Sequence, residues 1–115
     1  MIYFITQQEK FVKIGVGNNP EERLATLQTG NPHKLTLWFC IPGGYDEEKI
    51  LHHHLDCIRI SGEWFILNDY IREFAESIIT NFSGDIHKWI YTEKWVYDSY
   101  PINQDVIAGV DKAND

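Results

Sequence analysis

Polar side chains with an ordered spacing occupy the first part of this 115-residue chain. The set comprises a phenol at Tyr3, cations at Lys13 and Arg23, a carboxylate at Glu48 and an imidazole at His52. Hydrolysis of a phosphodiester bond needs an activated water, neutralised phosphate oxygens and a stabilised leaving group. The set offers proton acceptors, two cations and an oxygen ligand for a metal ion. These residue types favour metal-assisted phosphodiester cleavage.

Short strands and one helix are expected to hold the first of these groups. Residues 2–6 and 11–16 are β-rich runs, separated by a loop of hairpin length. Asn19 and Pro20 predict the start of a helix, because asparagine caps helices well and proline fits their first position. Gly30 is expected to end that helix, which carries the arginine of the set.

The next elements alternate in the same way. Residues 35–41 form a near-continuous apolar run, and we expect this run to be the central or most buried strand. Residues 46–57 have helical period, and residues 63–67 form a short extended stretch. A further helix is expected from Asn68 or Asp69 to Phe82. Its inward-facing residues are expected to be Ile71, Phe74, Ile78 and Ile79.

These elements predict an α/β (α+β) fold with a small, mostly antiparallel β-sheet flanked by helices. We expect residues 1–82 to form the main domain. Residues 83–100 are rich in tryptophan and tyrosine, and they are expected to pack on that domain as a helix or strand. Residues 101–115 are polar and acidic and are expected to fray.

Composition limits the classes of function. The net charge is −7, which predicts weak binding of DNA by the isolated chain, although the first 40 residues are slightly positive. No apolar run approaches the roughly 20 residues of a membrane span, and the first residues do not read as a signal peptide. Two cysteines, Cys40 and Cys57, do not form a disulfide framework. We therefore expect a cytoplasmic protein without a membrane partner.

Several motifs together resemble a known family. Ile2-Tyr3 and Lys13-Ile14-Gly15, followed ten residues after Lys13 by Arg23, resemble the signature of the GIY-YIG endonuclease superfamily. Met1 stands where the first glycine belongs, and Lys13 replaces the second tyrosine. Other motifs resemble one phage and bacterial branch of that superfamily, and the resemblance covers about residues 1–80. These motifs are Thr29-Gly30-Asn31-Pro32, Glu48 to Leu51-His52, and Gly62-Glu63-Trp64-Phe65.

The resemblance implies a DNA endonuclease that depends on Mg²⁺ or Mn²⁺. Glu48 would bind the metal ion, and Tyr3 would be the base that activates water. Arg23 would grip the phosphate, while Lys13 would act as a second cation beside it. His52 lies one helical turn after Glu48, so it would accept a proton or orient the carboxylate.

Three further residues are secondary candidates near such a site. Lys34 is a possible substrate-binding cation, and His33 is a possible catalytic histidine in a loop. Glu63 is a possible second acidic group, but its simplest role is structural, as an ion-pair partner for a base such as Arg59.

Two other classes of protein remain open. The acidic composition, the missing first glycine and the lack of a separate DNA-reading motif favour a binding module that does not cut. Such a module would bind a protein or a nucleic acid, in an accessory or inhibitory role, and a homodimer is possible. A structural zinc protein is the third alternative, because His53 and Cys57 are spaced by one helical turn.

Overall fold

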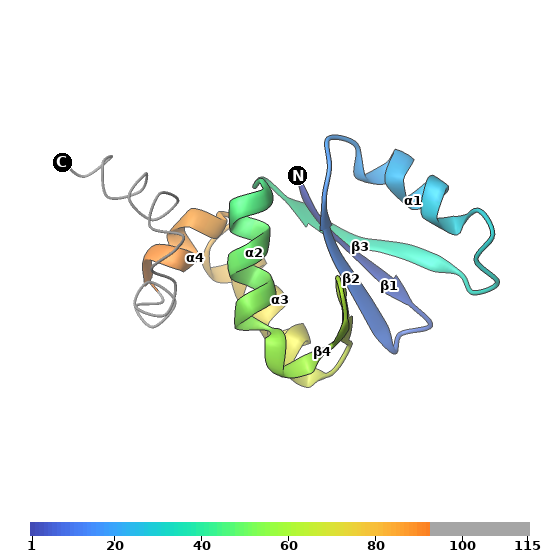
Figure 1. Cartoon of the computed structure of the whole chain (residues 1–115). Helices are drawn as coiled ribbons and strands as arrows, with labels where there is room; N and C mark the ends of the chain where they lie inside the picture. The colour runs from blue at the N-terminus through green and yellow to red at the C-terminus, as the bar shows by residue number, and fades with distance from the viewer. Residues whose placement is uncertain (93–115) are drawn as a thin grey trace.

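The computed structural model describes residues 1–92, which form a five-stranded sheet flanked by helices (Figure 1). The strand order is β3-β1-β2-β5-β4, and all neighbouring strands are antiparallel. The fold class predicted from the sequence is confirmed. The strands are β1 (Ile2–Gln7), β2 (Phe11–Val16), β3 (Leu35–Ile41), β4 (Arg59–Ser61) and β5 (Trp64–Ile66). The helices are α1 (Pro20–Gln28), α2 (Tyr45–His54), α3 (Asp69–Asn81), α4 (Ile86–Thr92) and the short 3₁₀ helix η1 (Asp56–Ile58).

The central strand of the sheet is β2, and its hairpin partner β1 lies beside it. The predicted hairpin is present, and its turn uses positive φ at Gln8 and Glu9 (53° and 55°). The expectation that residues 35–41 form the central or most buried strand is wrong, because β3 lies at the edge of the sheet and β1 has more buried residues. Its apolar run arises from cover on its two faces rather than from its place in the strand order. Phe39, for example, stacks on Phe4 of β1 with ring centroids 4.1 Å apart.

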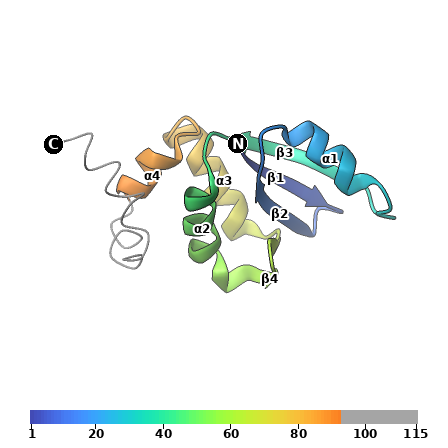
Figure 2. The same cartoon turned by 45° about the horizontal axis from the view of Figure 1, so that its top comes forward.

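Two apolar clusters lie on opposite faces of the sheet. The larger one contains Phe4 and Ile14 and is covered by α2, α3 and α4. The smaller one contains Tyr3 and Ile5, and α1 covers it with Leu24 and Leu27 (Figure 2). Alternate residues of one strand therefore serve different clusters, as the pleat of a strand requires.

Local signals place the ends of the helices well. The Asn19 side chain accepts a hydrogen bond from the Glu22 amide at 3.1 Å, and α1 ends two residues before Gly30, whose φ is +78°. Asn68 caps α3 in the same way, through the Ile71 amide at 3.1 Å. The predicted starts of both helices are confirmed.

Other boundaries differ from the sequence prediction. α2 ends at His54, and the residues expected to continue it form η1 instead. β4 was not predicted, because it is only three residues long and Ile60 within it is exposed. Ile79 was expected to face inward but is 46% exposed. Ile78 beside it is buried as expected, and so is Ala75 one turn earlier, a small residue that the hydrophobic pattern did not single out.

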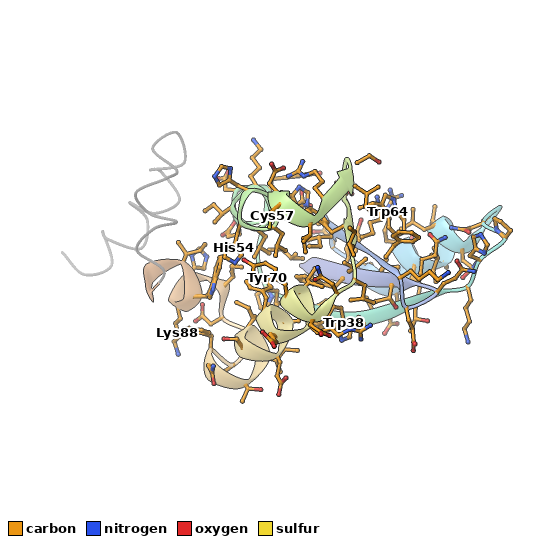
Figure 3. The ribbon with its side chains drawn as sticks, turned by 90° about the horizontal axis from the view of Figure 1, so that it is seen from below. Trp38, His54, Cys57, Trp64, Tyr70 and Lys88 are labelled. Atoms are coloured by element: carbon orange, nitrogen blue, oxygen red, sulfur yellow. The ribbon has the colours of Figure 1, made fainter. Side chains whose placement is uncertain are left out.

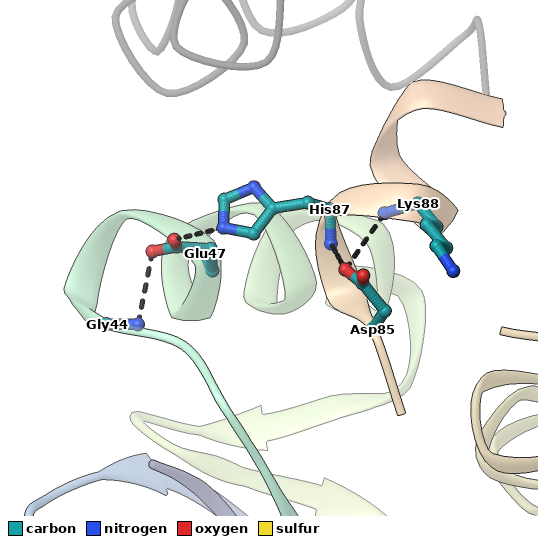
Figure 4. A network of polar contacts seen from close by, with 5 residues as sticks. All are labelled: Gly44, Glu47, Asp85, His87 and Lys88. Carbon is teal, nitrogen blue, oxygen red and sulfur yellow. Dashed lines mark hydrogen bonds and ion pairs between the residues drawn. The ribbon is translucent and has the colours of Figure 1, made fainter. Parts of the chain in front are cut away.

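The core continues past residue 82. Trp89 and Ile90 of α4 belong to the same buried cluster as the sheet residues, so the division of the chain at 82 remains a prediction. A polar contact also joins α4 to α2, since the His87 Nε2 atom lies 3.0 Å from a Glu47 carboxylate oxygen (Figure 4). The predictions for the rest of the 83–100 segment and for the 101–115 tail fall largely on residues outside the described part of the chain.

His54, on the last turn of α2, is a half-buried histidine within an aromatic cluster. Its ring lies among Tyr70, Phe74 and Trp89, and the Tyr70 hydroxyl is 3.3 Å from its Nε2 atom (Figure 3). Burial lowers the pKa of His54 to about 4.

No helix within residues 1–92 is both long and apolar enough to cross a bilayer.

Candidate active site

The candidate site lies where β2 meets α2 on one side and the start of β5 on another. Helix α2 packs against β2. Strand β5 pairs with β2, and Trp64 of β5 lies opposite Lys13 of β2. The hydrogen-bond ladder between β2 and β5 ends just beyond this pair, where the Ile14 amide donates to the Glu63 carbonyl at 2.9 Å. Groups of α2 and of the residues at the start of β5 therefore meet at Lys13 and Ile14 of β2.

Glu48 is the one charged residue that is buried within residues 1–92, with 6% of its surface exposed. Its Oε2 atom has no hydrogen-bond partner in that part of the chain. Burial, and next the negative charge of Glu63, raise the pKa of Glu48 to about 7, although Lys13 and Lys49 act in the opposite direction. A buried carboxylate oxygen without a donor is costly, so this position favours an added cation or a proton.

His52 is held through the backbone of β2. Its Nε2 atom is 2.9 Å from the Ile14 carbonyl oxygen, and a carbonyl can only accept, so Nε2 carries the hydrogen and donates. Burial is the largest cause that lowers the pKa of His52 below its usual value. The neutral ring then has its lone pair on Nδ1. This arrangement suits a proton acceptor.

Lys13 forms an ion pair that the sequence did not predict. Its Nζ atom lies 3.0 Å from the Glu63 carboxylate and 5.5 Å from the centre of the Trp64 ring. Arg59, which was expected to pair with Glu63, pairs with Asp56 instead, at 3.1 Å. Cross-strand pairing explains the difference: Trp64 sits opposite Lys13, so the preceding residue reaches the lysine.

Tyr3 is buried on the α1 face, with 2% of its surface exposed. Its ring lies directly over Gly15, its cross-strand neighbour, so closely that any side chain at position 15 would overlap it. It also approaches Gly17, which lines a surface groove together with Arg23. Arg23 is exposed at the start of α1. The fold therefore puts the tyrosine and the arginine on the same side of the sheet, joined through the backbone after β2.

Two secondary candidates lie at the other end of the sheet. His33 accepts a hydrogen bond from Gln8 at 2.9 Å, beside the β1–β2 turn, and Lys34 follows it directly. Both are exposed. Tyr3 is four residues from that end of β1, or about 13 Å along the strand. Their roles at the site remain predictions.

No group of three or more histidine, cysteine or acidic side chains within residues 1–92 is arranged to hold a metal ion. A zinc site built from such a group is therefore not found there. Mg²⁺ has different needs, since it is often held by one or two carboxylates together with waters and substrate phosphates. The hard, partnerless oxygen of Glu48 fits that mode of binding.

Comparison with known families gives one match. The T5orf172 domain family matches residues 1–83, which is most of the chain and includes every candidate site residue. This domain occurs in phage and bacterial proteins and is associated with GIY-YIG-like, nuclease-type folds. No curated protein and no solved structure matches the chain.

Proposed function

We propose that this chain, which belongs to the T5orf172 domain family, is a divalent-metal-dependent endonuclease that hydrolyses phosphodiester bonds in DNA through a GIY-YIG-type site. The observation that carries the proposal is the buried Glu48 carboxylate, whose Oε2 atom has no hydrogen-bond partner within residues 1–92. A protein that needs only stability gains little from such a group. A metal site gains an oxygen ligand from it.

Glu48 would hold Mg²⁺ or Mn²⁺. Such an ion, when bound, would polarise the scissile phosphate and offset the charge that develops on it. The carboxylate needs to be ionised for this role. Lys13 and Lys49 favour the ionised form, and a bound cation would favour it further.

The proton of the attacking water would go to a base on the chain. His52 is suited to this role, because its bond to Ile14 leaves the Nδ1 lone pair available and burial keeps the ring neutral. The Tyr3 hydroxyl would share in positioning or deprotonating the water, as the GIY-YIG resemblance implies.

The two cations would bind the phosphate. Lys13 would provide a point charge from its ammonium, while Arg23 would form a fork from the groove at the start of α1. Lys34 lies further along the sheet and would contact the DNA backbone away from the cleaved bond. With a net charge of −7, the chain depends on these few cations to attract DNA, so binding should weaken as salt rises, with the shallow slope expected for few phosphate contacts.

Cleavage of plasmid DNA with Mg²⁺ or Mn²⁺ tests the proposal, with linear, nicked, branched and single-stranded DNA as further substrates. Wild type should cut at least one of them, and Glu48→Ala should not. Glu73→Ala is a matched control, since Glu73 is an exposed glutamate on α3. Equal cutting by wild type and Glu48→Ala, or no cutting of any substrate, would refute the proposed mechanism.

A second function is a module of the same shape that binds a protein or nucleic acid without cutting it. Two observations favour it: Tyr3 is 2% exposed, and Lys13 is already paired with Glu63. Titration with Mn²⁺, followed by paramagnetic broadening of the Glu48 side-chain NMR signal, separates the two functions. Saturable broadening at Glu48 supports the nuclease, and its absence supports the binding module.

A further inference from the structure

Lys13, the proposed phosphate-binding lysine, is largely enclosed and already forms an ion pair with Glu63. Only 12% of its side chain is exposed, against 39% for its partner Glu63. An enclosed ammonium needs an acceptor near it, because water cannot solvate it fully. Glu63 provides that acceptor at 3.0 Å, and the face of Trp64 lies 5.5 Å away on the facing strand.

The backbone holds Glu63 in place for this contact. Gly62 has a φ of +55°, which glycine adopts easily, so the chain turns sharply between β4 and β5. The Glu63 carbonyl then accepts a hydrogen bond from the Ile14 amide at 2.9 Å. Ile14 follows Lys13 directly. This backbone hydrogen bond therefore holds Glu63 next to Lys13 at the end of the β2–β5 ladder.

The remaining residues of the Gly62-Glu63-Trp64-Phe65 motif support the same arrangement. Phe65 is fully buried in the larger cluster, which anchors β5 to the sheet. Trp64, on the opposite face of the strand, packs against the smaller cluster (Figure 3). The motif thus contains a turn residue, an acidic partner, a ring beside the ammonium and an anchor.

We propose that Glu63 is a positioning residue that holds the Lys13 ammonium at the site, so that the two side chains act as one unit. This role rests on the proposed nuclease function. An ammonium has three N–H donors, so an ion pair with one carboxylate leaves donors for phosphate oxygens. Glu63 would thereby fix the direction of the cation before the substrate arrives, which lowers the cost of ordering it during the reaction.

The charge of Glu63 also reaches the other site residues. It raises the pKa of Glu48 and opposes the lowering of the pKa of His52, while Lys13 acts on both in the opposite direction. The pair therefore presents a nearly neutral unit to the metal-binding carboxylate. Without Glu63, Lys13 would be free to turn towards Glu48 and compete with the cation there.

The first test observes the lysine itself, without any cleavage. NMR of ¹³Cε/¹⁵Nζ-labelled lysine in the metal-free protein should show altered Lys13 shifts and faster exchange of its ammonium hydrogens in Glu63→Gln. Asp56→Asn is the matched control, because it breaks the Arg59–Asp56 pair at 3.1 Å and should leave Lys13 unchanged. An unchanged Lys13 signal in folded Glu63→Gln would overturn the proposal.

The second test is a double-mutant cycle in the cleavage assay. Glu63→Gln should lower kcat by about 10²-fold with little change in KM, as expected for a misplaced catalytic group. Glu63→Asp should recover part of that loss. Adding Glu63→Gln to Lys13→Met should cost nothing further, because Glu63 acts through Lys13.

Two outcomes would contradict the positioning role, one in the double-mutant cycle and one in the Mn²⁺ titration. Fully additive losses would mean that Glu63 acts independently of Lys13. Loss of Mn²⁺ binding in Glu63→Gln as complete as in Glu48→Gln would make Glu63 a metal ligand instead. If wild type cuts no DNA, the nuclease proposal fails, while the NMR experiment still decides whether Glu63 holds Lys13.

Discussion

Replacing Glu48 by glutamine should stabilise the metal-free protein at neutral and higher pH. In the folded chain, burial and the charge of Glu63 raise the pKa of Glu48 from 4.5 to about 7. Below pH 4.5 the carboxyl is protonated in both the folded and unfolded states. Between pH 4.5 and about 7 the unfolded state has lost this proton while the folded state still holds it, so the free energy of unfolding falls as pH rises.

The size of this effect follows from the two pKa values. At about 1.4 kcal/mol per pH unit, a rise from 4.5 to about 7 corresponds to about 3 kcal/mol of lost stability. Glutamine has nearly the same shape and no charge to bury. Glu48→Gln should therefore match wild type at pH 4.5 and exceed it by up to about 3 kcal/mol at about pH 8.

Urea unfolding followed by tryptophan fluorescence measures the difference in EDTA at each pH. Glu73→Gln, an exposed substitution on α3, serves as the control and should follow the wild-type curve. Excess Mg²⁺ at about pH 8 should raise the stability of wild type but not of Glu48→Gln, since only the folded wild type binds the ion. The reasoning is refuted if Glu48→Gln is no more stable than wild type at that pH in EDTA.

Three smaller predictions concern the scaffold. His54→Phe should remove a loss of stability that wild type shows as pH falls from 6.5 to about 4, because the buried imidazole must stay neutral in the folded state; acid unfolding curves measure this. Gly15→Ala should cost about 1–3 kcal/mol in urea unfolding, because the added methyl group overlaps the Tyr3 ring, and an equal stability would contradict that packing. Asn19→Ala should cost about 1 kcal/mol by loss of the α1 cap, whereas Asn18→Ala should be nearly neutral.

Features that depend on neighbouring residues could be predicted from the sequence. The caps at Asn19 and Asn68 are local, since each side chain bonds an amide three residues away. The turn between β1 and β2 is also local. The order of the strands is not, and the apolar run of β3 gave the wrong place for it, because hydrophobicity reports how well the faces are covered rather than the number of neighbouring strands.

The residues of the candidate site divide in the same way. Their types and spacing were visible in the sequence, and so was the shared helix face of Glu48 and His52. The partner of Glu63 was not, because it depends on the pairing of β5 with β2 across some fifty residues of chain. The burial of Glu48 was equally hidden: an acidic run at a helix start is typical of an exposed helix end.

Two motifs that are distant in sequence, Lys13-Ile14-Gly15 and Gly62-Glu63-Trp64-Phe65, are in contact in the structure. The Lys13 side chain reaches Glu63, while the Ile14 amide bonds the carbonyl of that same glutamate. Because β5 begins only at Trp64, opposite Lys13, the Ile14 carbonyl is left to His52, and this bond sets the tautomer of the imidazole. The missing side chain of Gly15 makes room for the Tyr3 ring. A change in any one of these three residues should therefore disturb a different group of the site, even though the three are adjacent in sequence.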